Sequence, residues 1–264
     1  MYQYLTQTLA VPATHIRLLL SEPPSSPKMH FERATRANIL SSLHQHLYDN
    51  RDVRKGDNIL FYFAGRGARY SLDSTFPGTE DTLDALCPAD RGPSTAKDPI
   101  LDISDRELSV FLEELRDVKG SNVTVILDCS YLLGNVQNRA SSQQVRSAEP
   151  LPISVMKMLR AIREQPWTKT GIRKADTAEW DWDVRACMLL AACLLHEVVR
   201  ETVDEGRWGS YFTRALIAVL RASPDLTYAG LGEAVTEYMP RRGTWCVQHP
   251  MVIGARELER VWFV

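Results

Sequence analysis

The residues best placed to do chemistry follow two apolar stretches of the sequence. The stretch 58–65, NILFYFAG, runs directly into Arg66, which stands between two glycines. The stretch 122–130, NVTVILDCS, carries Asp128 near its end and closes on Ser130. Both stretches have the near-continuous hydrophobicity of strands that are buried on both faces. Ligands of open α/β sheets bind beyond the carboxyl ends of such strands, so the sequence predicts one site that both turns share.

These residue types do not make a pair of nucleophile and base. A serine hydroxyl attacks a peptide bond only when a nearby base accepts its proton. Arg66 stays protonated and offers only hydrogen-bond donors, so it cannot accept the proton of Ser130. The neighbouring thiol of Cys129 should face the core, because adjacent side chains of a strand point to opposite faces. Of the six histidines, His196 follows an apolar run and could approach the turns; the alternative, which we favour, is a loop histidine without a role.

Strand-like and helix-like stretches alternate along the chain, which predicts an α/β sheet with helices on both faces. Further strands are expected at 14–20, at 186–195 and at the C-terminal LERVWFV. Helices are expected at 35–50 and from Ser104, with Thr35 and Ser104 as N-caps, and at 210–222 and 227–239. Two stretches, 66–103 and 134–150, lack periodicity and are expected to be loops, the second of them flexible. We expect a single domain over residues 1–264, because no repeat or composition break divides the chain.

Composition excludes several classes of protein. A formal net charge of -2 gives no electrostatic basis for binding nucleic acid or an anionic membrane. No apolar run reaches the roughly 18–20 residues that span a bilayer, and residues 1–15 lack the features of a secretory signal. The five cysteines are scattered and form no C-x-x-C pair, so neither a zinc site nor a disulfide framework is predicted. We therefore expect a cytoplasmic protein without metal or cofactor.

The order of these motifs resembles the caspase and metacaspase peptidases (peptidase C14), especially the fungal metacaspase-like group. The matching segments are AGRGAR, DTLDALCPAD, LDCSYLLG, LLAAC and GSYFTRAL, and the resemblance extends along the whole chain. In the family the first turn reads A-G-H-G and supplies the catalytic histidine, and the second supplies the nucleophilic cysteine. Matching these turns places Arg66 at the histidine position and Ser130 at the cysteine position.

The resemblance implies a caspase-like three-layer α/β/α sandwich with a mostly parallel sheet. The family begins with a strand that lies inside this sheet, and the present sequence shows no counterpart of it. Its loss would leave neighbouring strands unpaired or force them together. We therefore expect either a rearranged sheet or a truncated product of a longer gene.

The resemblance also implies a loss of activity, since both members of the catalytic dyad are replaced. Losing one member of a well-studied hydrolytic triad costs about 10⁶-fold in rate. The first interpretation is therefore an inactive pseudo-peptidase with a binding or regulatory role. Its expected partners are active metacaspase relatives or basic peptide segments, with a possible dimer through a sheet edge such as LERVWFV. Two alternatives stay open: a cysteine-type endopeptidase that cleaves after Arg or Lys, and a degenerate gene fragment.

Two carboxylates are candidates for recognition of a basic substrate. Asp128 matches the aspartate that lines an acidic pocket for Arg or Lys in metacaspases, and Asp90 closes the carboxylate-rich loop 81–90. A buried carboxylate needs a partner. We predict that Arg66 lies over the cleft and pairs with Asp128 or Asp90; the alternative is that Arg66 points to solvent.

Two other features of the family are weakened in this sequence. The region that carries an acidic pair for calcium in metacaspases reads Ser104-Asp105 here, and Ser104 is better explained as a helix cap, so we expect no calcium site. The loop 134–150 matches the segment that is cut during maturation of the family. Without a nucleophile, its Arg139 and Arg146 are interpreted as solvated loop charges.

Overall fold

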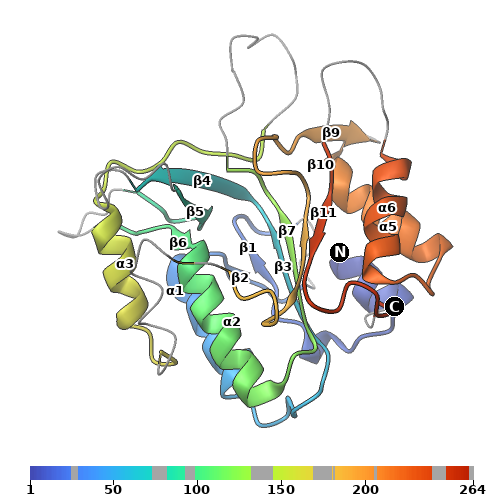
Figure 1. Ribbon diagram of the computed structural model, residues 1–264, viewed down its shortest axis with the longest axis horizontal. Helices are drawn as coiled ribbons and strands as arrows, with labels where there is room; N and C mark the ends of the chain where they lie inside the picture. The colour runs from blue at the N-terminus through green and yellow to red at the C-terminus, as the bar shows by residue number, and fades with distance from the viewer. Residues whose placement is uncertain are drawn as a thin grey trace.

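The computed structural model describes residues 1–24, 29–72, 82–92, 99–131, 145–168, 180, 182–204, 207–239 and 248–261, and for the stretches 202–204 and 207–208 only the backbone. Its central sheet has the strand order β11-β8-β7-β3 (Figure 1). The strands are β3 (Ile59–Ala64), β7 (Val123–Asp128), β8 (Met188–Ala191) and β11 (Met251–Ile253). β3, β7 and β8 are parallel, and β11 is antiparallel to β8. The carboxyl ends of the three parallel strands therefore lie together at the same end of the sheet.

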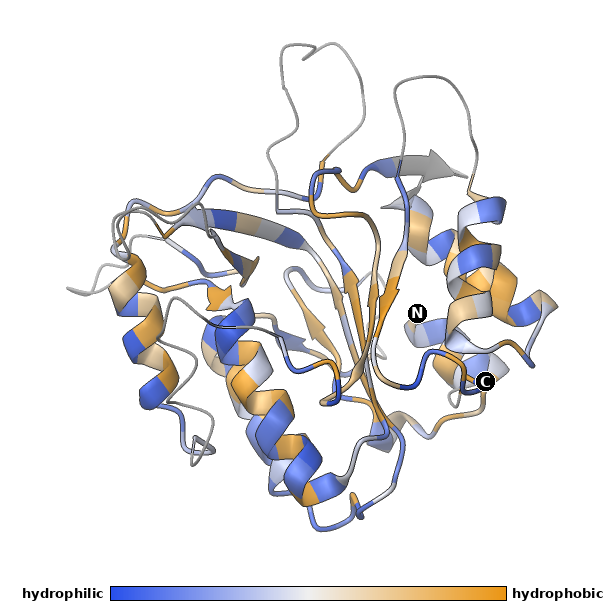
Figure 2. Ribbon diagram, viewed as in Figure 1, coloured by the Kyte–Doolittle hydropathy of each residue, from blue (hydrophilic) through white to orange (hydrophobic). Residues whose placement is uncertain are grey.

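Helices cover both faces of this sheet (Figure 1). On one face lie η1 (Tyr4–Thr8), α5 (Tyr211–Ala222) and α6 (Tyr228–Tyr238), which pack on side chains of β7 and β8. On the other face lie α1 (Arg36–Ser41), η3 (Ser42–Tyr48) and α2 (Asp105–Lys119). Figure 2 shows hydrophobic central strands between helices that carry both hydrophobic and hydrophilic residues. The predicted three-layer, caspase-like α/β/α class is confirmed.

The helices begin where side-chain oxygens cap them. Such an oxygen replaces the missing acceptor for the first N–H groups of a helix. The capping residues and the backbone N–H groups that they accept are Thr35 with Asn38, Ser104 with Glu107, Ser210 with Phe212 and Thr213, and Thr227 with Gly230. The predicted N-caps Thr35 and Ser104 are confirmed, and the four predicted helices are all present.

A second, antiparallel sheet stands beside the central one, with the order β4-β5-β6. Its strands are β4 (Arg66–Ser71), β5 (Thr82–Cys87) and β6 (Ile103–Ser104), and α3 (Val155–Arg163) packs on it. The prediction of a loop over 66–103 is therefore wrong for β4 and β5. Arg69 of β4 lies opposite Asp84 of β5 and forms an ion pair with it at 2.6 Å. These charged residues interrupt the apolar pattern that predicts a strand, and their charges neutralise each other across the sheet.

Other elements differ from expectation in extent. The strand expected over 14–20 shrinks to β1 (Leu19–Leu20), preceded by the 3-10 turn η2 (Ala13–His15), and pairs in parallel with β2 (Glu32–Arg33). A hairpin of β9 (Glu201–Asp204) and β10 (Arg207–Ser210) was not predicted. The prediction of a C-terminal strand is wrong for residues 258–261, where the structure has only an isolated bridge between Arg260 and Thr227. Residues 262–264 lie outside the described part of the chain. No helix among the described residues is long and apolar enough to cross a membrane.

β3 does not have the interior position that its sequence predicts. It is the last strand of the central sheet, and within the described chain no strand pairs with its other edge. Only Ile59 among its residues is buried, whereas every residue of β7 is buried.

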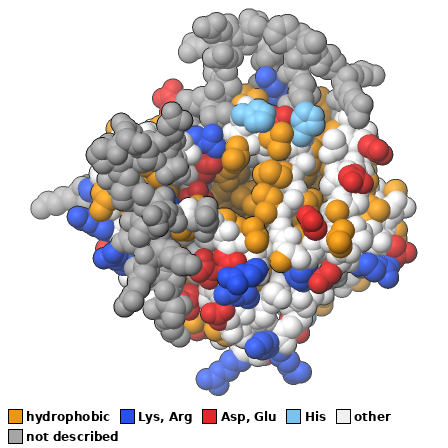
Figure 3. Space-filling model, in the orientation of Figure 1, with side chains coloured by type: hydrophobic (Ala, Val, Ile, Leu, Met, Phe, Trp, Pro, Cys, Tyr) orange, Lys and Arg blue, Asp and Glu red, His pale blue; other side chains and the backbone are white. Residues whose placement is uncertain are grey.

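The space-filling view shows hydrophobic side chains around a hollow near the middle of the face that it presents (Figure 3).

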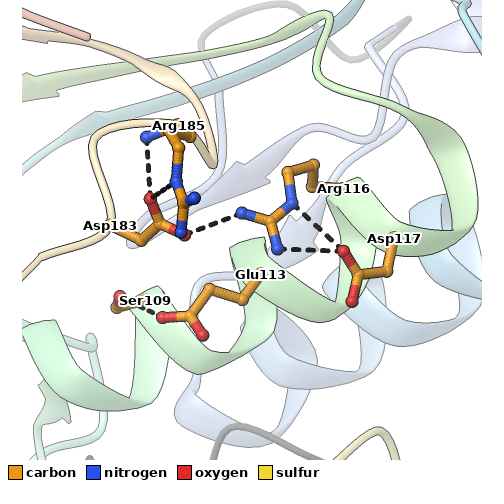
Figure 4. Close-up of polar contacts among 6 residues, drawn as sticks. All are labelled: Ser109, Glu113, Arg116, Asp117, Asp183 and Arg185. Carbon is orange, nitrogen blue, oxygen red and sulfur yellow. Dashed lines mark hydrogen bonds and ion pairs between the residues drawn. The ribbon is translucent and has the colours of Figure 1, made fainter. Parts of the chain in front are cut away.

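An ion-pair network fixes the chain where it enters β8 (Figure 4). Arg116 of α2 and Arg185 donate to the Asp183 carboxylate at 2.7 and 2.9 Å. The bonds from Arg185 and Arg116 hold the pKa of Asp183 well below its usual range. A cavity of about 400 Å³ lies here, lined by both arginines and by Cys187, at the amino ends of the strands. It is therefore at the end of the sheet opposite to the predicted site.

Candidate functional site

The two predicted turns meet at the carboxyl ends of β3 and β7. Gly65, directly after β3, donates its N–H to the carbonyl of Asp128, the last residue of β7, at 3.4 Å. The N–H groups of Gly67 and Ser130 then converge on one acceptor, the backbone carbonyl of Arg146, at 3.3 and 2.9 Å. The structure thus brings together the turns that the sequence places side by side, and adds a third segment to them.

Asp128 is the buried carboxylate of this site. Its side chain is fully buried. One carboxylate oxygen accepts from Ser210 Oγ at 2.7 Å, and the other accepts from Thr213 Oγ1 at 2.5 Å. Ser210 is the N-cap of α5 and Thr213 lies in its first turn, and the N-terminal end of a helix favours a negative charge. Burial raises the pKa of Asp128, and Arg146 together with the two hydroxyls opposes that rise.

Arg146 lies beside Asp128 and pairs with it. Its Nη1 lies 3.3 Å from the Asp128 carboxylate and donates to the Asp128 carbonyl at 3.1 Å. Its Nε donates to Glu201 at 3.1 Å, and only 13% of its side chain is exposed. The interpretation of Arg146 as a solvated loop charge is therefore wrong, because two carboxylates hold its guanidinium. Arg139 lies outside the described residues.

The segment around Arg146 is held as an extended peptide. The Arg146 N–H donates to the Val199 carbonyl at 2.9 Å, and Val145 forms an antiparallel bridge with Arg200. On the other side, the Ala148 N–H donates to the carbonyl of Gly67 at 2.8 Å. Paired backbone N–H groups on one carbonyl oxygen are the arrangement with which hydrolases stabilise an oxyanion. The segment around Arg146 is thus held by backbone hydrogen bonds on both sides, and its guanidinium lies between the carboxylates of Asp128 and Glu201.

Gly67 allows this close approach. A Cβ atom on Gly67 would stand 2.6 Å from the Tyr131 ring and 2.7 Å from the Ser130 carbonyl oxygen. Real Cβ atoms do not come so near to backbone atoms. The glycine that follows Arg66 is therefore required by packing against the Ser130 turn.

Ser130 has no base. Its side chain is 1% exposed, and no group of the described chain hydrogen-bonds to its Oγ. Arg66, at the position of the family's histidine, begins β4 opposite Cys87 and is exposed. His196 is also exposed. Cys129 is buried in the core cluster beside α2, where burial raises the pKa of its thiol, so the prediction that it faces the core is confirmed.

The predicted ion pair of Arg66 with Asp128 or Asp90 is wrong. Arg146 pairs with Asp128 in its place. The Asp90 carboxylate accepts a hydrogen bond from the backbone N–H of Arg36, the first residue of α1, at 2.8 Å. It therefore binds the start of that helix and not the groups around Asp128.

The Ser104-Asp105 region forms a helix start. Ser104 caps α2, and the partly buried Asp105 carboxylate accepts backbone N–H groups from Asp84 at 3.3 Å and from Arg106 at 2.7 Å. Burial and the neighbouring Asp84 raise the pKa of Asp105 to about 7. Across the residues that the structure describes, no group of three or more His, Cys, Asp or Glu could hold a metal ion.

Sequence reasoning missed four residues of the site. Ser210 and Thr213 stand in the segment GSYFTRAL, which was singled out but given no contact with Asp128. Arg146 was recognised as a basic residue of a polar loop, and its place in the acidic pocket follows from the chain path, which the sequence does not encode locally. Nothing in the sequence around Glu201 signals its role.

Comparisons with known proteins identify the family and the fold. The sequence profile of the family described as "Metacaspase, peptidase C14 domain" matches residues 1–136, which include both turns. No curated protein matches the chain. Among solved structures, the chain is similar to the crystal structure of protein GSU0716 from Geobacter sulfurreducens, with 19% sequence identity and a TM-score of 0.51. The similarity covers 84% of this chain and 74% of that chain, and it concerns the fold alone.

Proposed function

Because the chain belongs to the metacaspase family of C14 peptidases, we propose that it is a pseudo-peptidase whose cleft binds an arginine-bearing segment without hydrolysing it. One observation carries this proposal. The carbonyl of Arg146 is held by the N–H groups of Ser130 and Gly67, while the Ser130 hydroxyl has no partner among the described residues that could take its proton.

Hydrolysis fails for a chemical reason. The hydroxyl of Ser130 is a weak nucleophile until a base removes its proton. Arg66 is exposed and permanently cationic, so it neither reaches the hydroxyl nor accepts a proton. Cys129 is buried with a raised pKa, so its thiolate does not form at neutral pH. The backbone donors that remain can bind a carbonyl but cannot start the reaction.

Recognition of arginine is supported by the groups that hold Arg146. Asp128 and Glu201 offer two carboxylates to one guanidinium, which presents its donors in a fixed fork. A partner with an exposed arginine in an extended segment, including an active metacaspase, would use the same groups. Such a partner must first displace Arg146. Its apparent affinity is therefore its intrinsic affinity multiplied by the fraction of molecules in which Arg146 has left these carboxylates.

The test supplies the occupant in trans. The probe is a fluorescent peptide of the sequence QVRSAE, and its control carries uncharged citrulline in place of arginine. The Arg146→Ala variant should bind the arginine peptide at least about tenfold more tightly than the citrulline peptide, because charge-assisted hydrogen bonds to carboxylates are lost in the control. Adding Asp128→Asn to that variant should remove the preference. A folded Arg146→Ala variant that binds both peptides equally would overturn the proposal and would fit a fragment without a binding role.

A residual peptidase is the second candidate, and the paired N–H groups of Gly67 and Ser130 favour it. It predicts cleavage of the same peptide after its arginine. Mass spectrometry of the incubated peptide separates the candidates, because cleavage that disappears in Ser130→Ala would support the peptidase.

A further inference from the structure

Three arginines line the cavity at the amino ends of the strands. Its volume is about 400 Å³, and the residues that bound it include Arg116, Arg185 and Arg256. None of the described residues that line it is acidic. The volume lies within the usual range for sites of small ligands, roughly 300–1,000 Å³. A cavity of this size with a cationic wall favours a small anion.

Two of the three guanidinium groups share one carboxylate. Arg116 and Arg185 both donate to the same oxygen of Asp183, Oδ2, at 2.7 and 3.1 Å (Figure 4). Arg116 also pairs with Asp117, whose side chain is 58% exposed. Water and salt screen the charge of such an exposed acid, so it neutralises little of the charge of its partner. Asp183 therefore balances one of the two arginines, and positive charge remains at the cavity.

Arg256 adds a third cation that is held mainly by neutral groups. Its guanidinium donates to the side-chain oxygen of Asn122 at 3.0 Å and to the backbone carbonyl of Ser121. Its contact with the carboxylate of Glu259 is longer, 3.6 Å, and that side chain is 60% exposed. The neutral acceptors fix the position of the Arg256 side chain without neutralising its charge.

The backbone places these arginines around one opening. The Ala255 N–H donates to the Val184 carbonyl at 3.1 Å. Arg256 and Arg185 directly follow these two residues, so they lie at neighbouring points of the wall. Arg116 stands in the last turn of α2 and approaches from that helix. The cations thus come from three separate segments of the chain.

We propose that this cavity binds the phosphate group of a small organic molecule. A phosphate ester presents three acceptor oxygens, one for each guanidinium group, whereas a carboxylate presents two oxygens in one plane. The forked donors of arginine match phosphate geometry. Val184, Ala255 and Cys187 add apolar surface to the wall, which fits a compact apolar body on the phosphate. The cavity is at the end of the sheet opposite to Asp128, so this site does not depend on the function of the cleft.

Titration with phenyl phosphate, followed through the backbone amides by NMR, tests the proposal. Phenol is the control without the phosphate, and inorganic phosphate is the control without the apolar body. Phenyl phosphate should shift the amides of Val184, Cys187 and Ala255 and leave those of Gly67 and Ser130 unchanged. Phenol should shift none of them. Inorganic phosphate should bind more weakly than phenyl phosphate, and equal affinities would overturn the organic part of the proposal and assign the cavity to free phosphate.

Variants of the arginines sharpen the measurement. Arg185→Gln is the main variant, because 75% of this side chain is exposed and folding should tolerate its loss. It should weaken the binding of phenyl phosphate by at least about tenfold, since hydrogen bonds between charged groups are the strong ones. Arg256→Gln should weaken it in the same way. Arg160→Gln, at an exposed position of α3, is the matched control and should bind as the wild type does.

Three results would overturn the proposal. The first is that phenyl phosphate at millimolar concentration leaves the amides of Val184 and Ala255 unshifted. The second is that Arg185→Gln and Arg160→Gln bind phenyl phosphate equally well. The third is that citrate, a tricarboxylate, binds more tightly than phenyl phosphate, which would assign the cavity to carboxylates.

Discussion

Replacing Arg146 by alanine should destabilise the chain more at pH 8 than at pH 5. The substitution leaves the fully buried Asp128 carboxylate without its cation. Breaking a buried ion pair from one side costs about 3–5 kcal/mol. Arg146 keeps 13% of its surface exposed, and Asp128 keeps the hydroxyls of Ser210 and Thr213. We therefore expect about 3 kcal/mol, which lowers the melting temperature of a chain of this size by about 6–12 °C.

The pH dependence follows from the carboxylate. Burial raises the folded-state pKa of Asp128 above its unfolded value, and loss of Arg146 raises it further. When the pKa of an acid is higher in the folded state than in the unfolded state, the protein loses stability as the pH rises from the unfolded-state pKa through the folded-state pKa. At pH 5 more of the variant can neutralise Asp128 by protonation, so the cost of the substitution is smaller there.

Urea unfolding followed by circular dichroism at both pH values measures the effect. Arg66→Ala is the matched control, because it removes an exposed arginine and should change stability by less than about 0.5 kcal/mol. If Arg146→Ala and Arg66→Ala unfold alike at pH 8, then Arg146 does not hold the cleft and the reasoning fails.

Three further predictions concern the same region. The pKa of Asp105 is raised to about 7, so ionising this carboxyl should lower the stability of the wild type by about 2–4 kcal/mol between about pH 4 and pH 7. Asp105→Asn should remove this fall. Urea unfolding across that pH range would contradict the prediction if the free energy of unfolding changed with pH equally in both proteins. Gly67→Ala should cost about 1–3 kcal/mol through its clash with the Tyr131 ring, and an unchanged melting temperature would contradict the contact. Ser210→Ala should cost about 1–2 kcal/mol, since it removes both the cap of α5 and a donor to Asp128; calorimetry that finds no loss would refute the double role.

Much of the fold is predictable because local signals and burial agree. The apolar runs that became β7 and β8, and the capped helices that became α1 and α2, combine a hydrophobic pattern with a clear start. β4 and β5 were missed because their charges pair across strands that are distant in the sequence. The composition of β3 reports burial on both faces and does not name its neighbours, whereas its edge position agrees with the expectation that a sheet without the family's first strand leaves a neighbouring strand unpaired.

The site was predicted in part for a related reason. Strand ends located Asp128, Ser130 and Arg66, and the loss of a base follows from side-chain chemistry alone. The partner of Asp128 was assigned to Arg66, which is near in the motif, whereas Arg146 reaches the pocket from a loop. Ion pairs between remote segments depend on the chain path, and no local periodicity records that path.

Turnover of arginine- and lysine-ended fluorogenic peptides by the wild-type chain, with and without calcium, is the most direct measurement. The absence of a base at Ser130 predicts a rate equal to that of the Ser130→Ala variant under every condition. Turnover that exceeds the variant's rate and disappears when Ser130 or Cys129 becomes alanine would contradict a cleft that binds without hydrolysis.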